Sequence, residues 1–222
     1  MGGRIGVDEA GRGPVIGSMF VAAVGVPDPA IVPDDVADSK TLAPARRRDL
    51  ADRLSADPRV STAVVEVSAD TIDAEAGDLL GLVVRAFAEA IDRLDRPGWR
   101  VTLDAGEADA GRFADRVERH LDVTGPVTAA VRADATEPIV SAASVIAKEH
   151  RERHVERLGE RYGDVGSGYP ADPTTRAFLA AHVEATGELP ACARRCWQTS
   201  RDVLAAAEQS SLDGFVDTAT GD

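Results

Sequence analysis

Acidic side chains stand at or just beyond the ends of three stretches that read as β-strands: Asp8, Glu9, Asp104 and Asp134. The stretches are residues 5–7, 99–104 and 127–131. If these strands are neighbours in one sheet, the four carboxylates meet at one edge, where they repel each other strongly. Hard divalent cations remove that repulsion, and a pair of them supports attack of water on a phosphodiester. The pattern therefore predicts metal-dependent phosphodiester hydrolysis.

Chance alone ends some strands in Asp, because the chain contains 24 Asp. The sequence around the acids is far more specific. It contains, in order, DEAGRG at 8–13, DSK at 38–40, TLD at 102–104, AD at 133–134, SAASVIAK at 141–148 and GSGYPADP at 166–173. Together these motifs resemble the ribonuclease HII family (type 2 ribonuclease H), in its archaeal form, over about residues 4–200.

The resemblance implies an α/β protein with a ribonuclease H-like fold: a mixed sheet of about five strands flanked by helices, with additional C-terminal helices. It implies an endoribonuclease that cuts the RNA strand of RNA/DNA hybrids and single ribonucleotides embedded in duplex DNA, with 5′-phosphate and 3′-hydroxyl products. Such an enzyme serves ribonucleotide removal and RNA primer removal. The four acids match the family's metal ligands, for two Mg²⁺ or Mn²⁺ ions, with the choice of ion left open.

Two segments match the family's substrate-binding parts. Gly11, Arg12 and Gly13 let the backbone approach a ligand closely, and in the family this segment reads the 2′-hydroxyl that separates RNA from DNA. Tyr169 matches a tyrosine that packs on the sugar of the following nucleotide. A dinucleotide-binding loop is rejected, because Gly11, Gly13 and Gly17 have the wrong spacing and Pro14 precedes a β-rich stretch.

The lysines provide an argument that does not need the family. Of 25 basic residues only Lys40 and Lys148 are lysines, and both lie inside the motifs. Lysine carries a compact ammonium group, whereas arginine carries a planar guanidinium group. The geometry of a phosphate contact can therefore require lysine and exclude its replacement by arginine. Ser144 lies one helical turn before Lys148. We assign Lys40, Ser144 and Lys148 to phosphate contacts of the substrate.

The elements that position these residues alternate between strands and helices. Strands are expected at 5–7, 18–26, 60–67, 99–104 and 127–131, and helices at 42–54, 77–94, 113–121, 138–162, 176–186 and 197–208. We predict one catalytic domain over residues 1–208 and a flexible tail over 209–222. In this tail, Gln209, Leu212, Phe215 and Val216 have the spacing of a peptide that binds the sliding clamp PCNA.

The composition is strongly acidic, with a formal net charge of −13. A low-lysine, Asp-rich chain is typical of a high-salt cytoplasm, so we expect a halophilic, cytoplasmic protein. No apolar run is long enough to cross a bilayer, so we expect no membrane segment. We also expect a monomer, because nothing in the sequence pattern demands a second copy. Salt screens the repulsion from nucleic acid, and we expect Arg12, Lys40, Arg46 and Lys148 to form a local positive rim. Cys192 and Cys196 lack the partners of a zinc site.

Two other functions are alternatives to this interpretation. An inactive module that binds hybrids or the clamp would have lost a metal carboxylate, but all four are present. Another nuclease or a phosphatase on the same fold would have no use for the Gly-Arg-Gly loop together with Tyr169.

Overall fold

The computed structural model describes the backbone of residues 2–38 and 43–219, with side chains for all of these except residues 37, 38 and 210–219. Its contacts divide the chain into two compact units. The first comprises Met1–Arg12, Met19–Val67 and Gly77–Glu152. The second comprises Gly13–Ser18, Ser68–Ala76 and Arg153–Asp222. The predicted division at residue 208 stays a prediction.

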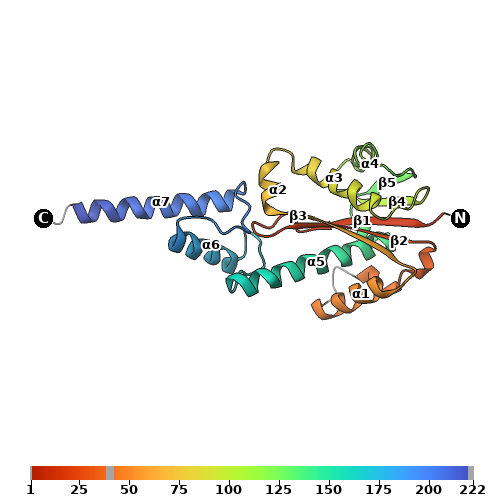
Figure 1. Ribbon diagram of the computed structural model, residues 1–222, viewed down its shortest axis with the longest axis horizontal. Helices are drawn as coiled ribbons and strands as arrows, with labels where there is room; N and C mark the ends of the chain where they lie inside the picture. Colours follow the sequence, from red (N-terminus) through yellow and green to blue (C-terminus); the bar gives the residue numbers. More distant parts are fainter. Residues whose placement is uncertain (1, 39–42, 220–222) are drawn as a thin grey trace. The chain divides into compact units, whose positions relative to one another are not determined.

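The first unit contains a mixed five-stranded sheet in the order β3-β2-β1-β4-β5 (Figure 1). Its strands are β1 (Arg4–Ala10), β2 (Met19–Val26), β3 (Ser61–Val67), β4 (Arg100–Asp104) and β5 (Val127–Ala130). Strand β2 pairs antiparallel with β1 and β3, whereas β1, β4 and β5 are parallel to one another. The five predicted strands and their mixed arrangement are confirmed.

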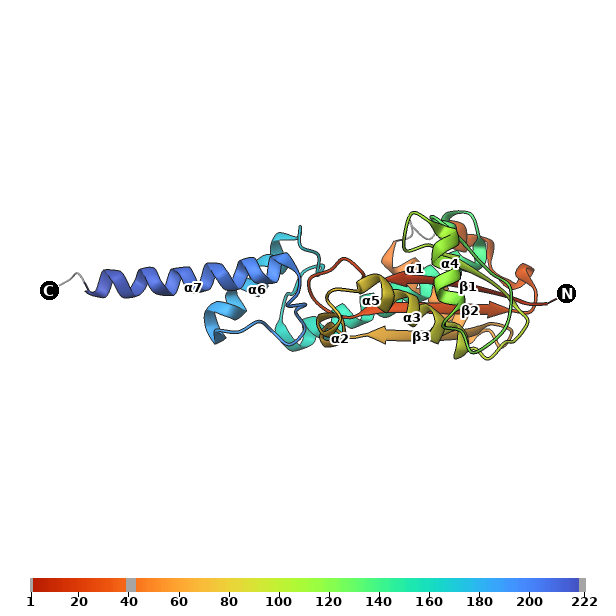
Figure 2. The same ribbon diagram turned by 90° about the horizontal axis from the view of Figure 1, so that it is seen from above.

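Helices cover both faces of this sheet. Helix α1 (Pro44–Ala56) and the first part of α5 (Pro138–Tyr162) lie on one face, and α3 (Leu79–Asp92) and α4 (Ala110–Glu118) lie on the other (Figures 1 and 2). Every residue of β2 is buried, which explains why its sequence is apolar throughout instead of alternating.

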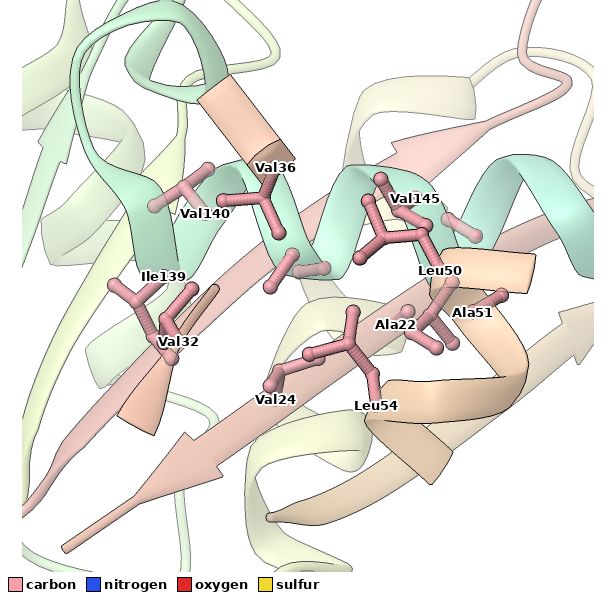
Figure 3. Close-up of a cluster of buried hydrophobic side chains, with 14 of the residues drawn as sticks. Ala22, Val24, Val32, Val36, Leu50, Ala51, Leu54, Ile139, Val140 and Val145 are labelled. Carbon is pink, nitrogen blue, oxygen red and sulfur yellow. The ribbon is translucent and has the colours of Figure 1, made fainter. Parts of the chain in front are cut away.

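Two apolar layers hold the helices in place. On one face, side chains of β2 meet those of α1 and α5, with Val24, Leu54 and Val145 among them (Figure 3). On the other face, the rings of Phe87 and Phe113 meet edge to face, with centroids 5.3 Å apart. Burial of these layers provides the main stabilisation of the unit.

Gly6 lies where β1 approaches the backbone of α5 closely. A Cβ atom at this position would overlap the carbonyl group of Ile139. We expect Gly6→Ala to lower the free energy of unfolding by about 3 kcal/mol, because backbone cannot move aside as a side chain can. Gly159 of α5 is the control, since a Cβ atom there meets nothing within 4 Å. Gly159→Ala should raise stability by about 0.5–1 kcal/mol in the same denaturant titration at high KCl. Equal effects of the two variants would contradict this packing.

The second unit contains α2 (Ala69–Ala74), α6 (Pro173–Thr186) and α7 (Gln198–Ala219). Its core joins Leu179 and Val183 of α6 to Val15, Ile16 and other buried residues. Helix α2 was not predicted, since six residues carry too little periodicity. Helix α7 continues to Ala219, so its predicted end at residue 208 is wrong. In the described part of the chain, no helix combines the length and the apolarity that crossing a membrane requires.

Candidate active site

The sheet brings the four acidic residues to one edge. Asp104 is the last residue of β4, and Asp134 lies in a short 3₁₀ helix (Ala133–Ala135) that follows β5. Asp8 and Glu9 lie inside β1, near its end, because β1 continues to Ala10 instead of stopping at residue 7. Since β1, β4 and β5 are parallel neighbours, their carboxyl ends meet, as the sequence predicts.

Electrostatics show how closely the carboxylates interact. Asp8 is 4% exposed, and burial raises its pKa well above the usual value, with further upward shifts from Glu9 and Asp104. Burial also raises the pKa of Glu9 to about 7, with Arg12 opposing this shift and Asp104 and Asp134 adding to it. The four acids therefore repel one another in a poorly solvated place, where a cation would be strongly favoured.

Backbone amides and Arg12 orient these side chains. The amide of Ala133 donates to Asp104 Oδ1 at 2.7 Å, and the amide of Glu9 donates to Asp8 Oδ1 at 2.7 Å. Arg12 donates from Nη1 to the carbonyl oxygen of Gly106 at 2.6 Å, and the same nitrogen lies 3.9 Å from Glu9 Oε1. The sequence does not predict the roles of Ala133 and Gly106, because both act through backbone atoms, which every residue type has. Ala133 contributes its amide and Gly106 its carbonyl oxygen.

The donor set fits a hard divalent cation. All four side chains offer carboxylate oxygens, the ligands that Mg²⁺ and Mn²⁺ prefer. Oε2 of Glu9 is buried without a hydrogen-bond partner, which a cation would supply. Among the residues that the structure describes, no three such side chains converge closely enough to enclose one ion, so binding requires some carboxylates to turn.

Two predicted phosphate-binding residues lie on α5 in the same unit. Ser144 is fully buried near Asp8, and its hydroxyl lowers the pKa of that carboxyl, without a hydrogen bond of normal geometry. Lys148 is half-buried, one turn further along the helix. Lys40 lies outside the described residues. The guanidinium of Arg46 contacts Asp35 at 2.8 Å and Asp49 at 3.2 Å, so these two acids offset the positive charge that we expect it to add.

The glycine segment and Tyr169 show the features expected of a close backbone approach. Gly11 has φ of +86°, a conformation that favours glycine. Within the second unit, the ring of Tyr169 lies beside Gly13, where a Cβ atom would be 3.7 Å from Cε1. Tyr169 is 45% exposed, although it is a large aromatic residue. Gly13 and Tyr169 are therefore neighbours, as a shared binding surface requires.

Comparison with known proteins settles the family. A sequence profile of the family "Ribonuclease HII" matches residues 5–200. The chain belongs to the ribonuclease HII family. Its members act on RNA/DNA hybrids with divalent metal ions, so this chain is a metal-dependent endoribonuclease. A ribonuclease HII from Haloarcula marismortui is 53% identical over 214 residues, which cover 96% of this chain and 100% of the relative. That relative comes from a haloarchaeon, as the acidic, low-lysine composition predicts.

Solved structures of family members have the same fold. The ribonuclease H2 of Pyrococcus horikoshii OT3 superimposes with a TM-score of 0.86 at 34% identity, over 93% of this chain and 99% of that chain. The ribonuclease HII of Archaeoglobus fulgidus, solved as a complex with PCNA, gives a TM-score of 0.79 at 36% identity, over 88% of this chain and 95% of that chain. The predicted ribonuclease H-like fold is thereby confirmed.

Proposed function

We propose that this ribonuclease HII hydrolyses its substrate with two divalent metal ions held by Asp8, Glu9, Asp104 and Asp134. The observation that carries the proposal is the gathering of these carboxyl groups in a buried place: burial raises the pKa of Asp8 and Glu9, and repulsion from neighbouring acids raises both further. Gathering four carboxyl groups at one sheet edge costs free energy, and bound cations offset this cost by neutralising the negative charges. When bound there, the ions would lower the pKa of the attacking water and stabilise the leaving 3′-oxygen, which gives 5′-phosphate and 3′-hydroxyl ends.

The chain's own residues have separate tasks in this reaction. Glu9 must release its proton to act as a ligand, and Arg12 favours this release because its positive charge lowers the pKa of Glu9. The amide of Ala133 donates to one oxygen of Asp104 and thereby orients this carboxylate. We assign Ser144 and Lys148 on α5, together with Lys40, to the phosphate groups of the cleaved strand.

We infer further that the preferred substrate is a ribonucleotide followed by a deoxyribonucleotide, as in a single ribonucleotide embedded in DNA. The neighbouring positions of Gly13 and Tyr169 support this proposal. Gly11, Arg12 and Gly13 would read the 2′-hydroxyl of the ribonucleotide. The ring of Tyr169 would pack against the next sugar, where a 2′-hydroxyl would be crowded. Such an enzyme would remove ribonucleotides and RNA primers from DNA.

Tyr169→Ala tests this recognition. We expect KM for a duplex with one ribonucleotide to rise about tenfold, because an aromatic contact of this kind is worth roughly 1–3 kcal/mol. A long RNA/DNA hybrid, in which every sugar of the cleaved strand is ribose, should be affected much less. Tyr169→Phe keeps the ring and should behave like the wild type. Equal losses on the two substrates would rule out the proposed role of Tyr169.

We also propose that Gln209, Leu212, Phe215 and Val216 bind a sliding clamp. The backbone of residues 209–219 continues α7, and Gln209 is exposed. The complex of PCNA with the Archaeoglobus fulgidus relative supports a clamp as partner. Phe215→Ala should reduce capture of the protein on an immobilised haloarchaeal PCNA at high KCl by about tenfold, since aromatic anchors dominate such contacts. Ser211→Ala is the control in the same segment. Undiminished capture of Phe215→Ala would contradict the proposal.

A further inference from the structure

A buried arginine and a tryptophan hold the loop that follows the glycine segment. Arg194 is fully buried, and its Nε donates to the carbonyl oxygen of Gly17 at 3.0 Å. Its backbone amide donates to the carbonyl oxygen of Val15 at 2.8 Å. The guanidinium carbon lies 4.9 Å from the ring centre of Trp197. All of these residues belong to the second unit.

Trp197 contacts Gly13, a residue that we propose binds the substrate. Its indole Nε1 donates to the carbonyl oxygen of Gly13 at 3.2 Å. On the other side of this loop, the amide of Val15 donates at 2.8 Å to the carbonyl oxygen of Gly168, the residue before Tyr169. The Trp197 hydrogen bond therefore acts on the same short loop that the Tyr169 segment contacts.

A glycine can be held in place only through its backbone, since it has no side chain. Gly13 is exposed and conformationally permissive, so the orientation of its carbonyl group depends on a partner. Burying a guanidinium is costly unless its hydrogen bonds and packing compensate for lost water. Arg194 meets this condition by bonding Gly17 and by packing against the Trp197 ring. Packing against Arg194 restrains the orientation of the indole, so that its Nε1 stays in position to donate to the carbonyl oxygen of Gly13.

We propose that Trp197 is a positioning residue that fixes the Gly13 peptide beside Tyr169 and thereby sets the preference for a ribonucleotide next to DNA. Arg194 keeps the indole in the required orientation. This inference rests on the junction recognition proposed above. It predicts that loss of one hydrogen bond changes substrate preference without changing the metal-dependent chemistry.

Trp197→Phe removes the indole donor and keeps an aromatic ring over Arg194. We expect KM for a duplex with one ribonucleotide to rise about fivefold, as loss of a single hydrogen bond predicts, with kcat nearly unchanged. KM for a long RNA/DNA hybrid should stay within about twofold. Trp99→Phe is the matched control, because Trp99 is the other tryptophan, lies in the first unit and packs against Arg96. It should leave the ratio of kcat/KM for the two substrates unchanged.

The ratio of kcat/KM for the two substrates separates positioning from general damage. A merely structural role of Trp197 would lower activity on both substrates equally and leave the ratio at the wild-type value, which would overturn the inference. Arg194→Lys is the second variant, and it should shift the ratio in the same direction as Trp197→Phe. A wild-type enzyme that shows no preference between the substrates would overturn junction recognition itself. If the wild type and Trp197→Phe prefer the duplex with one ribonucleotide over the long hybrid to the same extent, only the role of Trp197 is overturned.

Discussion

Replacing Asp134 with Asn is expected to lower kcat about a thousandfold while the protein stays folded, because the amide cannot neutralise a metal ion. Asp134 is 6% exposed, and Asn has nearly the same shape, so packing should be preserved. The measurement is single-turnover cleavage of a duplex with one ribonucleotide, at high KCl with Mg²⁺. Asp115→Asn, an exposed position on α4, is the matched control and should retain full activity. An Asp134→Asn enzyme with more than a tenth of wild-type kcat would contradict the assignment.

Replacing Asp8 with Asn should stabilise the metal-free protein, although it abolishes activity. The raised pKa of Asp8 means that its charged form destabilises the metal-free fold at neutral pH. A neutral amide removes that cost, so Asp8→Asn should unfold at higher denaturant concentration than wild type in EDTA, although it has lost activity. Function and stability would then conflict at this residue, as is common where charges are gathered for catalysis.

The metal-free protein should lose stability as pH rises from about 4.5 to 7, in part through Glu9. The pKa of Glu9 is raised from 4.5 to about 7 in the folded protein. A raised folded-state pKa contributes stability that is fully present below the unfolded value and is lost as pH rises through the folded value. The shift corresponds to about 3 kcal/mol. Chemical denaturation in EDTA at fixed high KCl measures this change.

Two comparisons isolate Glu9 in that experiment. Glu9→Gln cannot titrate at this position and should weaken the pH dependence, whereas Glu160→Gln, an exposed position on α5, should leave it unchanged. Added Mg²⁺ should also reduce the decline, because the ion binds the deprotonated form and stabilises the fold by mass action. A wild-type decline that Glu9→Gln reproduces in full would assign the effect to other groups.

The sequence predicts the site well where chemistry and periodicity coincide. The positions of Asp104 at the end of β4 and of Asp134 beyond the end of β5 follow from short apolar runs, and the parallel neighbours β1, β4 and β5 bring these acids together with Asp8. The exact end of β1 could not be predicted, because pairing with β2 continues to Ala10 through residues that are not apolar in type. Long-range pairing thus overrode local sequence preference.

Other features depend on tertiary contacts that residue types do not reveal. Ion pairs with Asp35 and Asp49 occupy Arg46, and only the folded arrangement of α1 and its neighbours brings Asp35 to this arginine. The hydrogen bond from Trp197 to Gly13 joins residues 184 positions apart. The monomeric state and the cytoplasmic location stay predictions.

The most direct test of the account uses a DNA duplex with one ribonucleotide, incubated at high KCl with Mg²⁺, Mn²⁺ or EDTA. We predict cutting on the 5′ side of the ribonucleotide with 3′-hydroxyl and 5′-phosphate ends, in the presence of a metal ion only. These ends mean that water attacks the phosphorus atom. Cutting in EDTA would mean that the reaction needs no divalent ion, and products ending in a 2′,3′-cyclic phosphate would mean that the 2′-hydroxyl is the nucleophile. Either result would contradict catalysis by metal ions at the four carboxylates.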